Sequence, residues 1–503
     1  MKLESILESV DWQLINGSSK ATITGIALNS NEVRSGYLFV ALKGAQTNGH
    51  LFISDALRRG AAAVAITNPE TIVAEKCNLV SVDGSADTLA RLAHNFYGRP
   101  DCRLIGITGT NGKTTTSYLV RYFLERKGIR TGLIGTVAYE FESVAIPAER
   151  TTPDVFKLYR LIWQMKQSGA QAIVMEVSSH ALHQNRVGFL TFDIAAFTNL
   201  TQDHLDYHHS MEEYFEVKKS IFDSLVEVSK DDIKYQAVVS IDDEWGRKLK
   251  RELDDRKIPV TTFGINSEAE YRAEDIHVNT GGSTFELHKM GVNCGKVNLN
   301  LLGRHNVANY LGAAAISDSL KVSDSEQVDE ALNVPNAPGR LEFIPNNLGI
   351  VIVVDYAHTD DALKKTLLCL REITENNLWV VFGCGGERDK LKRHRMGAVA
   401  EKFADKVILT SDNPRTEKPE QIIADIQKGM NKNKEDVLIK RSEAVASAIS
   451  NAKPGDVVLL AGKGHEAYQE INRVFYDYDD RAEARKVVAE LEKRSGGTMP
   501  SAF

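Results

Sequence analysis

The chain has 503 residues, enough for about three domains at roughly 150 residues each. Its composition, 43% hydrophobic and 26% charged, is that of a globular protein and excludes disorder as the dominant state. A net charge of −7 disfavours nucleic acid and anionic membrane surfaces as partners. The five cysteines form no CxxC pair, and no apolar run reaches the roughly 20 residues that span a bilayer. We therefore expect a cytoplasmic protein in a reducing compartment, without a signal peptide, nucleic-acid binding or membrane insertion.

Two breaks in the pattern of apolar residues divide the chain into three segments. The first is YGRP at 97–100, and the second is NVPNAPGR at 333–340, where prolines and a glycine interrupt helix and strand alike. We predict domains at residues 1–98, 99–334 and 335–503. Each alternates short, almost wholly apolar runs with helical patterns, which is typical of α/β sheets covered on both faces.

The predicted strands follow this alternation along the chain. In the first segment they lie at residues 37–42, 63–66 and 79–82. The middle segment has strands at 104–108, 132–137, 172–177, 192–200 and 237–241, and it ends in an alternating stretch at 271–302 that predicts antiparallel strands. The last segment repeats strand and helix, with strands at 350–357, 378–383, 406–412 and 456–462.

A glycine-rich turn follows the strand predicted at 104–108. The sequence GITGTNGKTTT at 106–116 then opens a helical pattern, which is the context of a phosphate-binding loop. In such a loop backbone N–H groups wrap the phosphates of a nucleotide, Lys113 reaches the terminal phosphates, and Thr114 can place its hydroxyl on Mg²⁺. The strict GxxxxGK[ST] pattern fails, because Ile107 stands where it requires glycine. The alternative is a glycine-rich turn with an incidental lysine.

Polar residues follow two more of the predicted strands. Glu176 comes at the end of the strand at 172–177, the place where a carboxylate holds the metal in P-loop enzymes. The stretch TNLTQDHLDYHH at 198–209 concentrates three histidines and two aspartates after the next strand. Histidine is a good partner for a metal or a phosphate. A solvated polar loop explains this stretch equally well.

The sequence at 211–225 predicts one amphipathic helix with a lysine in its apolar stripe. Lys218 lies at the centre of the stripe, whereas Lys219 points away from it. Lys218 either extends harmlessly to the surface or is buried with a lowered pKa, and a neutral amine is nucleophilic enough to be chemically modified. The apolar members of the stripe are Met211, Tyr214, Phe215, Ile221, Phe222 and Leu225.

In this order, the motifs resemble those of the Mur ligases, ATP-dependent enzymes that add amino acids to the peptidoglycan precursor. The resemblance implies a small N-terminal α/β domain that binds a UDP-sugar, a central P-loop domain with a mostly parallel sheet that binds ATP, and a Rossmann-like C-terminal domain that binds the amino acid. It rests on GTNGKTT at 109–115, EVSSH at 176–180, TNLTQDHLDYH at 198–208, Lys218, LLGRHNVANYLGAAA at 301–315, APGRLE at 337–342, VDYAHTDDAL at 354–363, FGCGGERDKLKR at 382–393, SDNPRT at 411–416 and AGKGHEAYQ at 461–469.

The resemblance implies a role for each matching position. It implies catalytic roles for Lys113, His204 and Lys218, with Lys218 carbamylated. Carbamylation would turn a cation into an anion that supports a second Mg²⁺ or orients the γ-phosphate of ATP. The implied metal ligands are Thr114, Glu176, His204 and Lys218. The implied nucleotide contacts are Gly109, Thr110, Asn111, Gly112, Lys113, Thr114, Thr115, Asn306, Arg340 and Asp355.

The substrate that the resemblance implies is UDP-N-acetylmuramoyl-L-alanyl-D-glutamate. Its uridine end matches Leu28, Ser30, Ala45, Gln46 and Thr47, and its muramoyl-dipeptide path matches Thr151, Thr152, Ser178, Gln184 and Arg186. The incoming amino acid matches Arg388, Asp412, Asn413, Pro414, Arg415, Gly462 and Glu466. The chain departs from the family pattern at Asn29, Asn31, Arg150 and His209, which puts the uracil and dipeptide contacts in doubt but not the reaction.

Arg415 predicts that the added amino acid is meso-2,6-diaminopimelate. This substrate carries a second carboxylate beside its distal amine, which L-lysine lacks, and the guanidinium fork of arginine binds a carboxylate bidentately. Diaminopimelate-adding members of the family resemble the DNPR at 412–415, whereas lysine-adding members replace the arginine. The alternatives are addition of L-lysine, or an Arg415 that only caps a loop beside Glu417.

Three other classes of protein share parts of the pattern. A switch-type GTPase needs an NKxD motif, which this sequence lacks. A folylpolyglutamate synthetase-like ligase typically begins near its P-loop, whereas a whole α/β segment precedes it here. A dinucleotide oxidoreductase needs GxGxxG after a strand, and FGCGGERDK fails that spacing. We expect a ligase, monomeric in solution, whose last domain closes over ATP.

Overall fold

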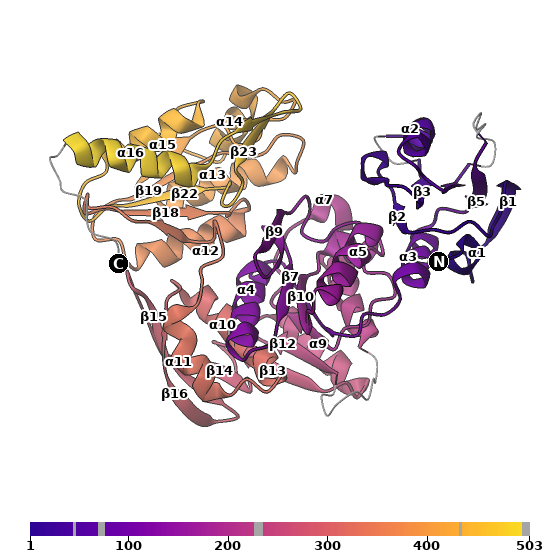
Figure 1. The fold of residues 1–503 in the computed structure, drawn as a ribbon. Coiled ribbons are helices and arrows are strands. Elements are labelled where there is room, and N and C mark those ends of the chain that lie inside the picture. The colour runs from indigo at the N-terminus through magenta and orange to yellow at the C-terminus, as the bar shows by residue number, and fades with distance from the viewer. Residues whose placement is uncertain (44–46, 69–75, 226–234, 432–434, 495–503) are drawn as a thin grey trace.

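The computed structural model describes residues 1–43, 47–68, 76–225, 235–431 and 435–494. Three large sheets follow one another along the chain, and Figure 1 shows three bodies, with the first in indigo and the last in orange and yellow. The middle body lies between the other two. The α/β class predicted from the sequence is confirmed.

The first sheet has five strands in the order β1-β5-β4-β3-β2. Strands β2 to β5 pair in parallel, and β1 pairs antiparallel with β5. Helices α1 (Leu3–Ile6) and α3 (Ala86–Tyr97) pack on one face, and α2 (Ile53–Arg58) on the other. Its strands are β1 (Trp12–Asn16), β2 (Gly25–Ala27), β3 (Tyr37–Ala41), β4 (Ala63–Ile66) and β5 (Asn78–Val82). The sequence predicted the last three of them.

The middle sheet has eleven strands in the order β16-β15-β14-β13-β12-β11-β6-β10-β7-β8-β9. Its centre is parallel, and antiparallel pairs extend it at both ends. The strands are β6 (Arg103–Thr108), β7 (Thr131–Ile134), β8 (Ala138–Phe141), β9 (Val144–Pro147), β10 (Ala172–Glu176), β11 (Ile194–Phe197), β12 (Gln236–Ser240), β13 (Val260–Gly264), β14 (Tyr271–Asn279), β15 (Gly282–Lys289) and β16 (Val292–Leu299). The helices are α4 (Lys113–Arg126), α5 (Val155–Gln167), α6 (Ser179–His183), α7 (Leu205–His208), α8 (Met211–Lys219), α9 (Glu244–Asp255), α10 (Arg304–Asp318) and α11 (Asp324–Glu330).

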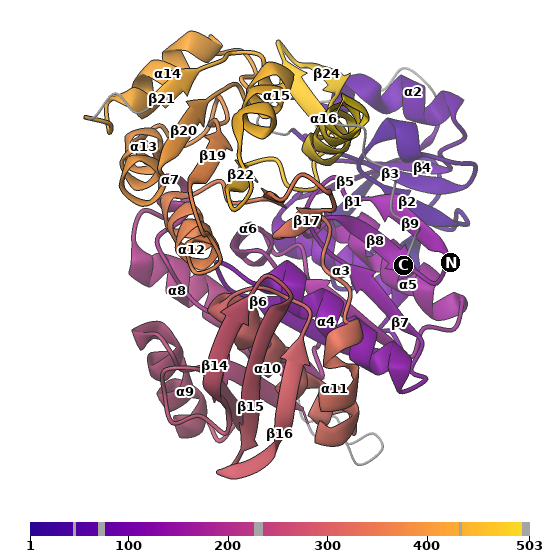
Figure 2. The ribbon, with the colours of Figure 1, turned by 90° about the vertical axis from the view of Figure 1, so that its left-hand side faces the viewer.

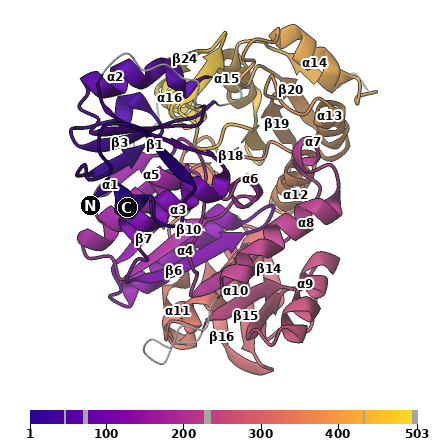
Figure 3. The ribbon, with the colours of Figure 1, turned by 90° about the vertical axis from the view of Figure 1, so that its right-hand side faces the viewer.

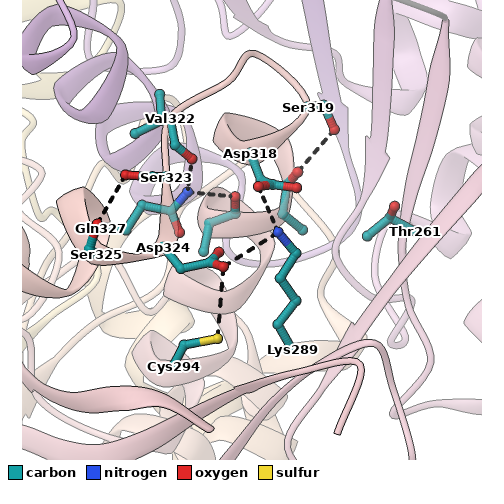
Figure 4. Close-up of polar contacts among 12 residues, drawn as sticks. Thr261, Lys289, Cys294, Asp318, Ser319, Val322, Ser323, Asp324, Ser325 and Gln327 are labelled. Carbon is teal, nitrogen blue, oxygen red and sulfur yellow. Dashed lines mark hydrogen bonds and ion pairs between the residues drawn. The ribbon is translucent and has the colours of Figure 1, made fainter. Parts of the chain in front are cut away.

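Strands β14 to β16 confirm the antiparallel stretch predicted at 271–302. A cluster of polar side chains ties this layer to α10 and α11, as Figure 4 shows. The ammonium of Lys289 lies 2.7 Å from Asp318 Oδ1 and 3.4 Å from Asp324 Oδ2. Burial opposes the charge of Lys289, but both aspartates outweigh it and raise the pKa of the lysine. The cluster therefore holds the layer against the helices by charge as well as by packing.

The last sheet has six strands in the order β17-β18-β22-β19-β20-β21, of which only β17 pairs antiparallel. A separate hairpin, β23 with β24, stands beside it. The strands are β17 (Glu342–Ile344), β18 (Val351–Asp355), β19 (Leu378–Phe382), β20 (Lys406–Leu409), β21 (Glu435–Val437), β22 (Val457–Ala461), β23 (Tyr468–Ile471) and β24 (Val474–Asp477). The helices are α12 (Asp360–Arg371), α13 (Leu391–Phe403), α14 (Pro419–Gln427), α15 (Arg441–Asn451) and α16 (Asp480–Arg494).

The helix predicted at 211–225 is shorter than expected. Helix α8 ends at Lys219, and residues Ser220–Ser224 continue as a 3₁₀ helix. The hydroxyls of Ser220 and Ser224 donate to the carbonyls of Val217 and Ile221, and serine side chains that bond the backbone in this way compete with a regular α-helix. The predicted apolar stripe is nonetheless buried, and Lys218 within it is only 1% exposed.

Contacts between side chains join the three bodies. Helix α3 of the first body packs on α5 of the middle body, which Figure 3 shows from that side, and Arg160 pairs with Glu32 across the same junction. Figure 2 shows α12 on the side of the last body that is turned toward the middle body. There Asn111 Nδ2 donates to Asp361 Oδ2 over 3.3 Å. Among the described residues, no helix is long and apolar enough to cross a membrane.

Candidate active site

The loop between β6 and α4 has the geometry of a phosphate-binding turn. Gly109 has φ +142°, and a Cβ there would lie 1.9 Å from Thr198 Oγ1, so only glycine fits. The backbone N–H of Thr110 donates to Asn199 O over 2.9 Å, and that of Asn111 to Asn199 Oδ1 over 3.0 Å. Asn199, which follows β11, therefore fixes the backbone of the loop that precedes Lys113 and helix α4.

Two lysines meet at this loop. Lys113 Nζ donates to the carbonyls of Gly109 and Thr110 over 2.8 Å each, and Lys218 Nζ donates to the same Gly109 carbonyl over 2.9 Å. Burial lowers the pKa of the Lys113 ammonium. Burial and repulsion from Lys113 hold the pKa of Lys218 well below its ordinary value. A buried lysine with a neutral amine is the second of the two alternatives that the sequence left open for Lys218.

Thr114 and Glu176 come together below the loop. Thr114 Oγ1 donates to Glu176 Oε2 over 3.0 Å, and both groups are buried. Thr136 donates to the same carboxylate from its backbone N–H and its hydroxyl, over 2.9 and 2.8 Å. Arg340 of the last body reaches Thr114 Oγ1 over 3.2 Å. Buried oxygen atoms that can coordinate a metal therefore lie together at the end of the P-loop. The guanidinium of Arg340, from the last body, lies beside them.

The aromatic ring of Tyr214 lies between His204 and Lys218. The ring of Tyr214 lies 4.7 Å from Lys218 Nζ and 6.3 Å from the His204 ring. His204 has φ +54°, and its side chain is 42% exposed. Burial works against the charge of Asp203, but His204, His358 and Lys392 hold its pKa below the ordinary value. In the described part of the chain, no three His, Cys, Asp or Glu side chains are grouped as metal ligands.

A cavity of about 540 Å³ extends from the phosphate loop between the middle and last bodies. Asn111, Gly112 and Thr115 line one end, and Arg340, Asp355 and His358 contribute from the last body. Phe263 and Ile265 supply apolar wall. A cavity of this size that combines backbone amides of the phosphate loop with apolar side chains suits a nucleotide.

The structure places the predicted nucleotide residues Asn306 and Asp355 around this cavity. Asn306 Nδ2 donates to Leu302 O over 2.9 Å, and its Oδ1 accepts from Asn309 over 3.0 Å. Asp355 is buried and accepts from the backbone N–H groups of Leu341 and Ala357. Burial raises the pKa of Asp355, against the opposing effect of Arg340. Hydrogen bonds within the protein therefore hold both side chains in place beside the cavity.

The five residues predicted for the dipeptide path form one connected group. Thr151 Oγ1 lies 3.1 Å from Thr136 Oγ1, and Thr152 Oγ1 donates to the backbone carbonyl of Glu176. Arg186 donates to Thr152 O over 3.0 Å and to Gln184 Oε1 over 2.6 and 3.0 Å. Ser178 N donates to Thr152 Oγ1 over 3.1 Å. The group continues directly from the Thr114–Glu176 pair.

The predicted uridine contacts lie in the first body. Ser30 is buried and bonds to Asp55, Leu28 is half-buried, and Thr47 is exposed. Ala45 and Gln46 lie outside the described residues. Two departures from the family pattern have local structural roles. Asn29 Oδ1 accepts from the backbone of Asn31, and Asn31 Oδ1 accepts from Arg59 over 3.0 Å.

The residues predicted for the incoming amino acid gather in the last body. Asp412, Asn413 and Pro414 are buried after β20, and Asn413 Nδ2 donates to Glu466 Oε2 over 2.8 Å. Gly462 has φ +109°, and a Cβ there would lie 3.0 Å from Asp412 Oδ2. Arg388 is exposed, and its side chain lies against Gly385 beside that of Arg415. All seven predicted residues therefore belong to one region.

Arg415 has a partner that the sequence did not indicate. Its Nε lies 3.0 Å from Glu470 Oε2, and its Nη1 donates to Gly386 O over 2.7 Å. Its backbone also pairs with β23, since Arg415 N donates to Glu470 O over 3.1 Å. Glu417, the neighbour named in the structural alternative, is held by Arg393, so the acidic partner of Arg415 is Glu470.

Relatives across nearly the whole length identify the family. A curated protein of Geobacter metallireducens, named UDP-N-acetylmuramoyl-L-alanyl-D-glutamate--2,6-diaminopimelate ligase, is 40% identical over 99% of this chain and 100% of its own length. One of Geobacillus kaustophilus with the same name is 40% identical over 97% and 100%. The chain belongs to the Mur ligase family. Family models agree, with the Mur ligase family, catalytic domain at 22–97, the Mur ligase middle domain at 107–317 and the Mur ligase, glutamate ligase domain at 339–464.

Solved Mur ligases share the fold. A structure titled UDP-N-acetylmuramoyl-L-alanyl-D-glutamate--2,6-diaminopimelate ligase matches with a TM-score of 0.65 and 32% identity, over 98% of this chain and 99% of that one. Thermotoga maritima MurF, solved in complex with ADP, matches with a TM-score of 0.66 over 93% and 98%. At 23% identity the second likeness supports the fold alone.

Several side chains of this Mur ligase site were missed by sequence reasoning. Lys463 is fully buried among the residues that were predicted to bind the incoming amino acid, and Glu470 pairs with Arg415. His358 and Lys392 act on Asp203 from the last body. Lys463, His358 and Lys392 lie inside motifs that the sequence did single out, so a search for charged residues within those motifs could have found them. Glu470 follows the last such motif and gave no signal.

Proposed function

We propose that this Mur ligase adds meso-2,6-diaminopimelate to UDP-N-acetylmuramoyl-L-alanyl-D-glutamate with ATP as energy source. The observation that carries the proposal is the continuous series from the P-loop through Thr114–Glu176 to Thr152 and Arg186. It leads from the nucleotide cavity to a cationic side chain suited to a substrate carboxylate. The names of the relatives and the solved structure agree with this reaction.

The reaction makes an amide from a carboxylate, which is a poor electrophile. An oxygen of the D-glutamate γ-carboxylate attacks the γ-phosphorus of ATP, the bond to the β-phosphate oxygen breaks, and ADP leaves. The amine then attacks the acyl phosphate, loses a proton, and expels inorganic phosphate. Phosphoryl transfer requires positioning and neutralised charge more than covalent help. Lys113 and the amides of the P-loop supply both.

The residues at the end of the P-loop fit Mg²⁺. Thr114 and Glu176 offer buried oxygen atoms, the donors that this ion prefers. We propose Thr114, Glu176, His204 and carbamylated Lys218 as its ligands. When bound, Mg²⁺ would neutralise phosphate charge. Arg340 brings a further positive charge to Thr114 when the last body lies against the middle one.

We also propose that Lys218 is carbamylated. Its lowered pKa favours the neutral amine, whose nitrogen lone pair attacks CO₂, and the loss of one proton gives a carbamate anion. The product carries a charge opposite to that of Lys113, which removes the repulsion between the two lysines. Lys113 and Lys218 both donate to the carbonyl of Gly109, so the carbamate on Lys218 would lie beside the P-loop.

Specificity for diaminopimelate is proposed to lie in Arg415. Two of its nitrogens are held, Nε by Glu470 and Nη1 by Gly386 O, which fixes the plane of the guanidinium. The remaining N–H groups suit the distal carboxylate of diaminopimelate, and Asp412 and Glu466 suit its ammonium. L-Lysine would bring an ammonium to Asp412 and Glu466 but no distal carboxylate to Arg415.

The domain organisation belongs to the same proposal. We place the boundaries near residues 98 and 334, giving UDP-sugar-binding, ATP-binding and amino-acid-binding domains. We propose that the enzyme is a monomer in the cytoplasm, where its nucleotide substrates are made. Closure of the last domain over ATP would bring the amine to the acyl phosphate.

An ADP-release assay tests the function. The purified enzyme is given ATP, Mg²⁺ and UDP-N-acetylmuramoyl-L-alanyl-D-glutamate, with meso-diaminopimelate, L-lysine or no amino acid. We expect ADP release and a product heavier by one diaminopimelate less one water only in the first case. A parallel assay with a reduced folate and L-glutamate tests the rival ligase. Turnover there, without turnover of the muramoyl dipeptide, would overturn the proposal.

A further inference from the structure

Lys463 is a buried cation inside the amino-acid site. It follows β22 in the loop that also carries Gly462 and Glu466, and its side chain is 0% exposed. The ammonium lies 3.1 Å from Asn413 Oδ1, 3.2 Å from Glu466 Oε2 and 3.5 Å from Asp412 Oδ1. These three partners are the residues expected to bind the distal ammonium of the amino acid.

The charges around Lys463 do not balance within the group. Asp412 and Glu466 bring two negative charges to one buried ammonium, which leaves the group with one net negative charge. Behind it, Arg441 and Asp480 form a fully buried pair at 2.7 Å that adds no net charge. Lys392 acts on Asp412 from α13, and Tyr356 and Tyr468 are neutral neighbours. The group of Asp412, Glu466 and Lys463 holds one carboxylate more than its ammonium can balance, which suits a cationic ligand.

Lys463 favours the ionised form of each carboxylate. Burial disfavours the charged form of Asp412, but Lys463, then Arg441 and Lys392, hold its pKa below the ordinary value. Burial raises the pKa of Glu466, Lys463 counteracts that rise, and Asp412 adds to it. Without the ammonium, two like charges would share one dry site, and one carboxylate would take up a proton.

We propose that Lys463 is a positioning residue that keeps Asp412 and Glu466 ionised together and holds Asn413 in place, so that the pocket can bind the distal ammonium of the incoming amino acid. This inference rests on the proposed function. It assigns to the pocket a second recognition element, separate from Arg415, which acts on the distal carboxylate. Lys463 itself does not contact the substrate in this scheme.

The other fully buried cations of this body serve different partners. Arg393 is held by Glu417 and Asp425, and Arg441 by Asp480. Neither of them bonds to Asn413 or Glu466, so their ion pairs anchor loops and helices. Arg393 therefore offers a matched control, since its removal also strips a buried cation from two carboxylates in the same body.

The test measures kcat/KM for meso-diaminopimelate as a function of pH in Lys463→Met, Lys463→Arg and Arg393→Met. In Lys463→Met we expect KM for the amino acid to rise more than about tenfold, while KM for ATP and for the UDP-sugar dipeptide stays within about twofold. The acid limb of the profile should move toward neutral pH by about one unit. Lys463→Arg should keep the wild-type acid limb, and so should Arg393→Met.

The outcomes separate the two proposals. A wild-type enzyme without turnover of meso-diaminopimelate would overturn the proposed function and this inference with it. An active wild type whose Lys463→Met variant has an unchanged acid limb, or loses only kcat, would overturn this inference alone. Should Lys463→Met fail to fold, Lys463→Gln, which keeps an amide donor but no charge, gives the same comparison.

Discussion

Lys113 and Lys218 donate to one backbone oxygen, the carbonyl of Gly109, over 2.8 and 2.9 Å. One lysine begins α4 and the other lies near the end of α8, so this shared acceptor joins two helices around the phosphate loop. The two ammonium groups repel each other, and the more deeply buried one gives up its proton more readily. The neighbouring Lys219 is paired with Glu216 and Glu252, which favour its protonated form, so we do not expect it to be carbamylated.

The first prediction concerns the charge at Lys218. Lys218→Ala should lose at least about 10³-fold in kcat, because the site loses the proposed anion that orients the phosphoryl group. A small carboxylic acid should restore part of the activity by occupying the vacated space. Lys218→Arg should be equally inactive, since guanidinium keeps its positive charge and cannot be carbamylated. The measurement is ADP release with and without added acid.

Lys219→Ala is the matched control for this experiment. It removes a lysine from the adjacent position of the same helix, one that pairs with Glu216 and Glu252 and lies over the ring of Phe215. We expect its kcat to stay within about twofold of wild type, as for most surface changes. Full activity in Lys218→Arg would contradict carbamylation.

The second prediction is a pH dependence of stability at Arg393. Hydrogen bonds from Arg393 lower the pKa of Glu417 to about 2, from an ordinary value of 4.5. A carboxyl with a depressed pKa stabilises the fold above its ordinary pKa, and this contribution is lost as pH falls from about 4.5 toward 2. Arg393→Met should cost about 2 kcal/mol at pH 7, because it removes a fully buried cation that donates to two partly exposed carboxylates.

Denaturant unfolding at pH 7 and at pH 3 checks this prediction. The difference in free energy of unfolding between wild type and Arg393→Met should shrink at pH 3, because this pH lies below the ordinary pKa of 4.5, so the unfolded chain then holds a proton that folding of the wild type must release. Lys390→Met is the control, because Lys390 meets the same carboxylate from 3.5 Å but is largely exposed. An equal difference at both pH values would mean that Arg393 acts by packing alone.

Sequence reasoning located the strand ends because buried parallel strands are short apolar runs with polar residues after them. It placed Lys218 in an apolar stripe, and the structure buries that side chain. It missed β1, β2, β9, β17 and β21, which are short strands at sheet edges, the β23–β24 hairpin outside the large sheets, and β8 and β13 within the middle sheet. Lys463 was missed for another reason. Its burial depends on Asp412 and Asn413, some fifty positions away in the chain, and no local pattern records that.

The third prediction concerns the polar cluster around Lys289. Lys289→Met would leave Asp318 and Asp324 facing each other without the cation between them. We expect a loss of about 1 kcal/mol in unfolding free energy, the scale of partly exposed ion pairs. Lys296→Met, on the exposed side of the neighbouring strand β16, should cost less than about 0.5 kcal/mol. Equal effects in both variants would show that the cluster adds nothing.

The last prediction concerns the choice between meso-diaminopimelate and L-lysine. Because Glu470 already pairs with Arg415 at 3.0 Å, the guanidinium is not left wholly unpaired when lysine occupies the pocket. The penalty for lysine is therefore smaller than for an isolated buried arginine, and we expect discrimination of roughly 10²–10⁴-fold. Arg415→Ala should lower kcat/KM for diaminopimelate by about that factor and leave the trace rate with lysine nearly unchanged.

Glu470→Gln keeps a hydrogen-bond acceptor for Arg415 Nε but no charge, so it should raise KM for diaminopimelate by less than about tenfold. Competing the two amino acids in one reaction and weighing the products measures the ratio directly. If the unmutated enzyme consumed both amino acids at similar rates, Arg415 would not be the discriminating residue.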